Sequence, residues 1–340
     1  MAATSHSGKR GWFFLLGVIA AGGWPCGAAD LSQEAEALLA RARELSSIRA
    51  GGSPPFLLRG RLRLVSVPNG PIEGTYEEVR DSHGKWRRVL SLPDLKFQVV
   101  EVSDGRRIYR AGSNAYQPYF EYRLRQLLSL RDGPRIPKSE DVTEIHRRKI
   151  RNRPAACVYS KRKGMKREVC VDSETSLAAF EREQSGDGKW TFEYLNYTPV
   201  GTHSYPRLLR EREHKAVFVE IEITELTAGA EPDAALFLPP AGAVDWPDCE
   251  RPFPPEALET PRPRSPWSAR VLMGRRSVIT YLVVGMDGRP HQVTPVRSDT
   301  LALTKATLDA ITLHWRFRPA ACQGEPVPAP ILVETNFYLF

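Results

Sequence analysis

Alternating apolar and polar residues, broken by glycine-containing turns, dominate the chain between residues 58 and 226. In segment 216–226, for instance, apolar side chains fall at every second position and mostly acidic side chains fall between them. Turn sequences separate such segments at Asn69-Gly70, His83-Gly84, Asp104-Gly105, Lys163-Gly164 and Gly186-Asp187-Gly188. Because a period of two puts neighbouring side chains on opposite faces, this pattern predicts many short antiparallel strands in one large curved sheet or barrel.

Two segments have the periodicity of amphipathic helices instead. Residues 31–48 place apolar side chains three or four positions apart, and Asp30 stands where a helix cap is expected. A second helix is predicted within residues 116–130 and interrupts the series of strands. Its expected apolar face consists of Tyr116, Phe120, Leu124, Leu127 and Leu128. Each helix has one apolar stripe to bury, so we expect both to cover the sheet, which makes the chain an α+β protein.

A dense run of prolines divides the chain. The segment 247–266 contains Pro247, Pro252, Pro254, Pro255, Pro261, Pro263 and Pro266. Proline cannot donate a backbone hydrogen bond to a sheet, so this density predicts an extended, semi-rigid linker. At roughly 150 residues per domain, the length suggests about two domains. We therefore predict a leader over 1–29, a sheet domain over 30–245, a linker over 246–268 and a small domain over 269–340.

The final segment predicts a second α+β unit with the order strand, strand, helix, strand. Two β-like segments flank Met286-Asp287-Gly288-Arg289, which is typical of a hairpin turn. A helix is expected from about Ala302 to Trp315, and the apolar segment 331–340 is expected to form the closing strand.

The first 29 residues have the features of an export signal. Lys9 and Arg10 precede the short apolar run 11–23, and small residues follow at 27–29. About 13 apolar residues fall short of the ~20 that a membrane-spanning helix needs. We expect cleavage near Ala29 and a periplasmic protein. The alternative is an uncleaved leader that anchors the chain in the inner membrane.

Four cysteines remain after the leader, an even number that favours disulfides in an exported chain. Cys157 and Cys170 lie on two strands around Lys163-Gly164, and a two-residue turn there would place them directly opposite each other. Two buried thiols are the alternative for this pair. Cys249 and Cys322 are then paired by elimination. Because no cysteine or histidine has the spacing of a zinc site, we predict no bound metal.

Several motifs of the small domain carry a family resemblance. These are the run Val284-Gly-Met-Asp-Gly-Arg-Pro, a helix that ends in His314-Trp-Arg-Phe-Arg-Pro-Ala, and Gly324-Glu-Pro-Val-Pro before the closing strand. Together they resemble the TonB C-terminal domain family. The resemblance implies a small ββαβ domain in the periplasm that binds a partner protein by adding a strand at a sheet edge. We assign the partner strand to Ile331, Val333 and Phe337. The alternative is that this strand is buried as a central strand.

Residues 30–245 resemble the LolA-like group in the order of their elements, namely an opening helix and a long antiparallel sheet interrupted by a second helix. The exit Leu236-Phe-Leu-Pro-Pro-Ala-Gly also resembles that group. The resemblance implies a half-barrel whose concave apolar face holds acyl chains beneath helices. The candidate cavity residues are Leu62, Leu64, Trp86, Phe97, Val99, Phe120 and Leu124. The alternative is that these side chains simply pack under the helices.

Basic residues are concentrated between positions 146 and 167. They are His146, Arg147, Arg148, Lys149, Arg151, Arg153, Lys161, Arg162, Lys163, Lys166 and Arg167. We interpret this basic cluster as a solvated sheet face, with peripheral contact to anionic lipid head groups as the alternative. Interleaved acidic residues, the lack of aromatic residues for base stacking and the export signal argue against nucleic acid.

No catalytic motif is present, and we predict neither an enzyme nor a cofactor. The sequence thus predicts a non-enzymatic periplasmic protein that binds a lipid or lipoprotein acyl chain in the half-barrel and an envelope protein through the small domain. The alternative is an adaptor, scaffold or relative of TonB-type energy transducers that binds proteins only.

Overall fold

The structure, a computed structural model, describes residues 28–65, 70–128, 134, 136–137, 140–162, 164–185, 188–213, 216–249, 252–267, 273–298 and 300–339. Residues 1–27 of the predicted leader lie outside this set, and so does Lys163 of the basic cluster.

Thirteen strands form one large sheet. The first group is β1 (Phe56–Leu64), β2 (Ile72–Arg80), β3 (Trp86–Leu92), β4 (Phe97–Ser103) and β5 (Arg107–Gly112). The second is β6 (Asp141–Ile150), β7 (Arg153–Arg162), β8 (Met165–Asp172), β9 (Ala178–Ser185), β10 (Gly188–Val200), β11 (His203–Glu213) and β12 (Ala216–Ala228). The short strand β13 (Val244–Pro247) completes the sheet, and short 3₁₀ turns lie at η1 (Pro93–Leu95) and η3 (Ala234–Phe237).

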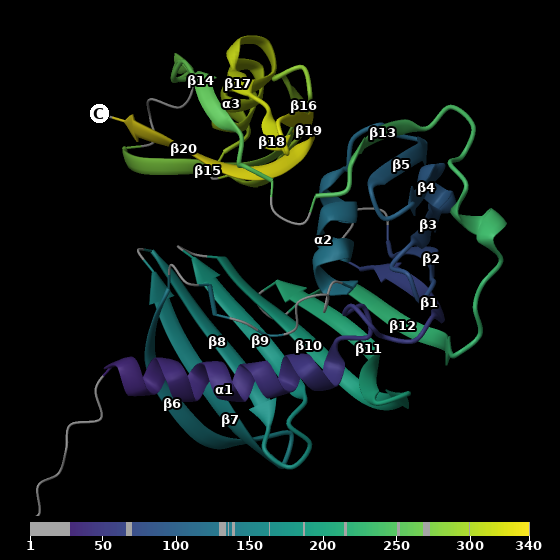
Figure 1. The fold of residues 1–340 in the computed structure, drawn as a ribbon. Coiled ribbons are helices and arrows are strands. Elements are labelled where there is room, and N and C mark those ends of the chain that lie inside the picture. The colour runs from purple at the N-terminus through teal and green to yellow at the C-terminus, as the bar shows by residue number, and fades with distance from the viewer. Residues whose placement is uncertain are drawn as a thin grey trace, which may run out of the picture.

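The sheet consists of two antiparallel meanders joined along β1 and β12. Its order is β13-β5-β4-β3-β2-β1-β12-β11-β10-β9-β8-β7-β6, so each meander follows the chain. The sheet curves strongly but stays open, because β13 and β6 stand at its two ends and do not pair with each other (Figure 1). The predicted α+β class with a large curved antiparallel sheet is therefore confirmed, and a closed barrel is not formed.

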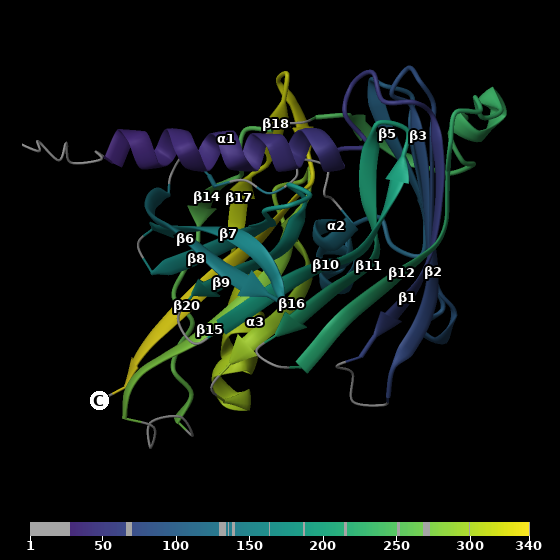
Figure 2. The same ribbon diagram turned by 90° about the horizontal axis from the view of Figure 1, so that it is seen from below.

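Helix α1 (Ala28–Ser46) lies across the strands of the second meander (Figures 1 and 2). It begins two residues before the predicted cap at Asp30. Ala35, Leu39 and Ala42 point into a buried cluster with Val158 and Val169 of the sheet. We call this side of the sheet, which also carries the second helix, the helix-covered face.

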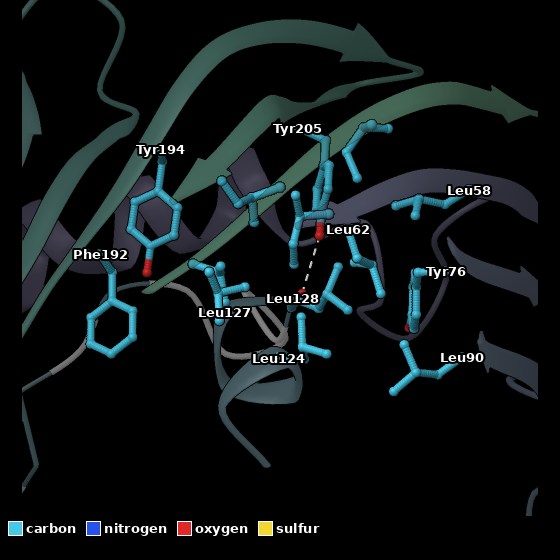
Figure 3. Packing of buried hydrophobic residues seen from close by; sticks show 14 of the residues in the cluster. Leu58, Leu62, Tyr76, Leu90, Leu124, Leu127, Leu128, Phe192, Tyr194 and Tyr205 are labelled. Carbon is cyan, nitrogen blue, oxygen red and sulfur yellow. Dashed lines mark hydrogen bonds between the residues drawn. The ribbon is translucent and has the colours of Figure 1, made fainter. Parts of the chain in front are cut away.

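Helix α2 (Tyr119–Leu128) covers the junction of the two meanders. Leu124, Leu127 and Leu128 are at most 4 % exposed, and their side chains meet leucine and tyrosine side chains of the strands (Figure 3). Tyr205 of β11 donates a hydrogen bond from its hydroxyl to the carbonyl of Leu128 (3.1 Å) at the end of the helix. Tyr116, which we expected on the same apolar face, precedes the helix and stacks on His291 instead.

The hairpin of β7 and β8 has the predicted register. Cys157 lies opposite Cys170, and Val158 lies opposite Val169. The two cysteines form a disulfide, and so do Cys249 and Cys322. Because alternate residues face opposite sides, the valines pack under α1, whereas the disulfide is buried on the other face beside Phe180.

The C-terminal module forms a smaller α+β unit. Its strands are β14 (Glu256–Glu259), β15 (Gly274–Val284), β16 (Pro290–Ser298), β17 (Arg316–Arg318), β18 (Ala320–Cys322), β19 (Glu325–Val327) and β20 (Ala329–Leu339), and its helix is α3 (Leu301–His314). β16, β15 and β20 form a three-stranded sheet in that order. Thr300 caps α3 by accepting a hydrogen bond from the Leu303 amide (3.2 Å).

The turn between β15 and β16 depends on Gly288. Its φ of 73° is a left-handed conformation, and a Cβ there would lie 2.3 Å from the carbonyl oxygen of Phe317. Its own carbonyl accepts a hydrogen bond from the Phe317 amide (2.9 Å). The hairpin predicted around this glycine is therefore held directly against β17.

Two strands that the sequence did not predict lie at the proline-rich segment: β13 ends at its first proline, Pro247, and β14 lies within it. β13 pairs with β5 of the large sheet, and β14 pairs with β17 of the C-terminal module. The predicted linker over 246–268 thus begins within one sheet and contributes a strand to another. Six of its seven prolines lie outside these two strands, where no ladder hydrogen bond is required, and Pro247 is the last residue of β13.

Candidate functional site

Most of the residues predicted to line a ligand cavity lie in the core formed by α2 and the strands that it covers. Six of them are between 0 and 4 % exposed, namely Leu62, Leu64, Trp86, Phe97, Val99 and Leu124. The seventh, Phe120, is partly buried and meets the ring of Phe97 edge-on, with the centroids 4.9 Å apart. The structure brings these side chains together except Trp86, which is buried outside the cluster. Leu124, Leu127 and Leu128 of α2 belong to the same buried cluster and lie near Leu62, Tyr76 and Leu90 of the strands (Figure 3).

The helix-covered face also contains a buried ion pair that the sequence analysis missed. The guanidinium of Arg49 contacts the carboxylate of Glu78 at 2.6 Å, and both side chains are at most 2 % exposed. Tyr76 donates a further hydrogen bond to Glu78 (2.9 Å). Burial alone would raise the pKa of Glu78, but the charges of Arg49 and Arg88 outweigh it and hold this pKa well below its usual range.

A second buried ion pair ties α2 to the sheet. Arg110 of β5 donates hydrogen bonds to Glu101 of β4 (2.7 Å) and to Glu121 of α2 (2.8 and 2.7 Å). Arg125 contacts both carboxylates as well, at 2.5 Å. Burial opposes the ionisation of Glu101, yet the charges of Arg125 and Arg110 lower its pKa to about 2. A signal was available in the sequence, because Glu101 and Arg110 interrupt the apolar alternation of their strands.

A third set of charges lies on the same face in the second meander. Arg167 of β8 forms ion pairs with Glu140 (3.2 Å), Glu183 (2.6 Å) and Glu181. Burial, together with the nearby charge of Glu183, raises the pKa of Glu181 to about 7, although Arg167 opposes the shift. The helix-covered face is therefore apolar only in part, because buried charges interrupt it at these three places and also where Arg123 of α2 pairs with Glu211 of β11.

The C-terminal module presents β20 as an edge strand. β20 pairs with β15 along its whole length: Leu339 lies opposite Gly274, and Ala329 lies opposite Val284. β20 is the end strand of its sheet. Its 11 residues thus have one edge with no strand partner among the described residues. Such an edge is a template for an added strand.

The side chains assigned to the partner strand face inwards. Phe337 is 4 % exposed and packs with Val278 and Leu303, and Ile331 and Val333 are partly buried against the cluster of α3. The exposed apolar side chains of β20 are Leu332 (47 %) and Tyr338 (59 %), which the sequence analysis did not single out. Recognition at this strand would thus use its backbone edge and these two side chains.

Part of the proline-rich segment lies beside β20. The indole nitrogen of Trp315, at the end of α3, donates a hydrogen bond to the carbonyl of Pro261 (3.1 Å). A cavity of about 480 Å³ lies between the segment and the strand. It is lined by Thr260, Arg262, Pro263, Ser265, Trp315 and residues 334–338.

The C-terminal module contacts the large sheet domain through aromatic side chains. The hydroxyl of Tyr281 in β15 donates a hydrogen bond to the carbonyl of Gln117 (2.8 Å). The rings of Tyr119 and Tyr122 each lie 5.3 Å from that of Tyr281, centroid to centroid. Tyr281 is fully buried, so the two modules share a small core at this joint.

The basic cluster is split between the two faces of the sheet. Arg148 lies on the face of the disulfide, where it contacts Glu168, whereas Arg167 lies on the helix-covered face. Arg151 pairs with Glu193 (2.7 Å) and Arg153 with Asp172 (2.9 Å). Most of the described residues of the basic cluster are exposed, as expected for a solvated face, but the strand register places them on both faces of the sheet and acidic neighbours pair with several of them.

Two further features bear on chemistry. In the part of the chain that the structure describes, one group of side chains is close enough to share a metal ion, namely Cys157, Glu168 and Cys170, and a disulfide joins its cysteines. None of the helices within the described ranges is both long and apolar enough to cross a bilayer.

Comparisons with known proteins give similarities for both parts of the chain. No curated protein matches its sequence. A LolA superfamily protein from Nitrosomonas europaea covers 60 % of this chain and 97 % of its own, with 10 % identity and a TM-score of 0.41. A domain described as an outer membrane lipoprotein-sorting protein, from Vibrio parahaemolyticus, covers 61 % of this chain and 97 % of its own, with 10 % identity and a TM-score of 0.43. The structure of MucB covers 68 % of this chain and 74 % of its own, with 18 % identity and a TM-score of 0.28.

The C-terminal module has a match of a different kind. Residues 269–339 match the family model of the Gram-negative bacterial TonB protein C-terminal domain, about a fifth of the chain. The match contains the β15–β16 hairpin, α3 and β20, in the region where the sequence motifs carry the same resemblance. The C-terminal module is therefore similar to the TonB C-terminal domain family, as the sequence predicts.

Proposed function

We propose that this protein is a non-enzymatic adaptor of the cell envelope, located in the periplasm, which binds a partner polypeptide along β20. The observation that carries the proposal is the free edge of this 11-residue strand in a module that matches the TonB C-terminal family. A partner strand would gain main-chain hydrogen bonds from the edge and side-chain specificity from Leu332 and Tyr338. Two disulfides support an oxidising compartment.

Site-specific photocrosslinking tests this proposal. A photoreactive phenylalanine analogue replaces Leu332 or Tyr338 on β20, and the matched control replaces Leu313, which is 60 % exposed on α3 of the same module. We expect one discrete envelope adduct from positions 332 and 338 and no such adduct from 313. Equal adducts at all three positions, or none at β20 on irradiation in cells, would contradict docking at this edge.

Acyl-chain binding, which the resemblance of residues 30–245 implies, is the second candidate. The curved sheet and its apolar side chains favour it, and each buried CH₂ group would contribute about 0.8 kcal/mol. An acyl chain would have to displace the leucines of α2, while Arg110 and Glu121 hold that helix in place. Native mass spectrometry decides the matter: co-purified lipid supports carriage, and a protein that neither carries lipid nor takes up a fluorescent fatty acid excludes it.

A further inference from the structure

A polar cavity of about 260 Å³ lies where the C-terminal module meets the large sheet domain. Its walls come from four places: the turn after α1, strands β2 and β3, the α2 region, and β20. It is lined by Arg49, Tyr76, Arg88, Gln117, Tyr122, Arg125, Gln126, Leu128 and Pro330. Neither the cavity prediction from the sequence nor the proposed docking at β20 uses this space.

The lining consists largely of hydrogen-bond donors. Three guanidinium groups face the cavity, and no carboxylate does. The acidic partners of these arginines are Glu78, Glu101 and Glu121, which are not part of the lining and whose side chains are at most 5 % exposed. Because a guanidinium has five N–H donors and no acceptor, it can pair with one or two carboxylates and still have a donor available for another ligand.

Two donors of the lining lack an acceptor. The Nε atom of Arg88 and the amide nitrogen Nε2 of Gln117 are buried and have no hydrogen-bond partner. A buried donor without a partner costs about 1–3 kcal/mol. A small shift of either side chain toward the cavity would let a ligand oxygen accept from it, so a ligand with acceptor oxygens would be favoured here. Tyr122 adds a further hydroxyl to the lining, whose oxygen accepts a hydrogen bond from Gln126 (2.6 Å).

We propose that this cavity binds a phosphate group, either as a free phosphate or as the head group of a lipid. Donors on separate walls match a tetrahedral oxyanion, whose oxygens point in several directions, better than a planar carboxylate, which one guanidinium can satisfy alone. Pro330 belongs to β20, so the bound phosphate would contact both modules. The site does not depend on the proposed docking at β20 and is tested apart from it.

Calorimetric titration of the full chain with inorganic phosphate tests the proposal. The diagnostic variant is Gln117→Glu, which places a negative charge in the cavity and should weaken phosphate binding by about 30-fold or more. The matched control is Gln98→Glu, which makes the same change at an exposed position of β4 and should leave binding unchanged. Gln117→Met, of similar volume and without charge, serves if Gln117→Glu does not fold, and it should weaken binding about tenfold.

Two further arms identify the source of the phosphate. Acetate should compete weakly, since a carboxylate fits the arrangement less well. Phosphatidylcholine vesicles with and without phosphatidylglycerol show whether a lipid head group enters the cavity. A lipid is assigned if the protein is retained only on vesicles with phosphatidylglycerol, if Gln117→Glu abolishes this retention, and if inorganic phosphate reverses it. Phosphate binding without vesicle retention assigns a free phosphate. The absence of both, or equal binding by wild type and Gln117→Glu, overturns the proposal.

Discussion

Glu181 shows at the scale of one residue how the charges of the helix-covered face affect stability. Its carboxylate lies beside Arg167 and Glu183, and its pKa rises from the usual 4.5 to about 7. A folded-state pKa above the unfolded one means that the folded protein binds this proton more tightly. The resulting stability is fully present below about pH 4.5 and is lost as the pH rises through about 7.

Glu181→Gln should therefore stabilise the protein only at high pH. At pH 8 the wild type must keep a charged, mostly buried carboxylate, so we expect the variant to unfold with a free energy about 1–3 kcal/mol larger. At pH 4 the two proteins should be equal, because Glu181 is protonated in both states. Urea unfolding at the two pH values measures this. Glu222→Gln, at an exposed carboxylate, is the control, and a gain at pH 4 as large as that at pH 8 would refute the mechanism.

At the scale of elements, Gly288 determines how the β15–β16 hairpin meets β17. In Gly288→Ala the new Cβ would meet the Phe317 carbonyl at 2.3 Å while φ stays at 73°. We expect a loss of about 2–4 kcal/mol, against about 1–2 kcal/mol for Gly274→Ala, whose positive φ is similar but whose surroundings are open. Thermal unfolding of both variants tests the difference, and equal losses would show that close packing at Gly288 contributes nothing.

The elements that sequence reasoning recovered are those with a strong local pattern. The hairpin register at Cys157 and Cys170, the turn around Gly288, and the helices α2 and α3 all follow from periodicity or turn chemistry. The strands β13 and β14 were missed because their pairing with β5 and β17 is a tertiary event in a segment whose prolines argue against strands.

The site was harder to predict than the fold. Apolar residues on alternate positions were correctly placed on one face, but the pattern says nothing about whether a helix fills the space above them. The residues that line the proposed phosphate cavity come from positions as distant as Arg49 and Pro330, and only the folded chain brings them together. Glu101 and Arg110 were visible as breaks in the alternation, and buried charge pairs are one physical reason for such breaks.

At the scale of the whole molecule, the two disulfides close loops of very different length. Cys249 and Cys322 are 73 residues apart, and their bond connects the proline-rich segment to the C-terminal module, whereas Cys157 and Cys170 are 13 residues apart within one hairpin. A longer loop loses more entropy when it is closed in the unfolded chain. Replacing Cys249 and Cys322 by serine should therefore lower the free energy of unfolding by about 4 kcal/mol, and replacing Cys157 and Cys170 should lower it by about 3 kcal/mol. Denaturant unfolding of the two double variants checks this order, which a larger loss for the hairpin pair would reverse.

The large sheet and the three-stranded sheet of the C-terminal module end in strands of opposite character. β6, at one end of the large sheet, carries Asp141, Glu144, Arg147, Arg148 and Lys149 within ten residues. β20 has Glu334 as its single charged residue. Charged side chains on a terminal strand discourage stray pairing with other chains. The charges on β6 thus disfavour the addition of foreign strands at that end of the large sheet, whereas β20 has little such protection. Overproduction of this protein without its partner would therefore favour self-association through β20.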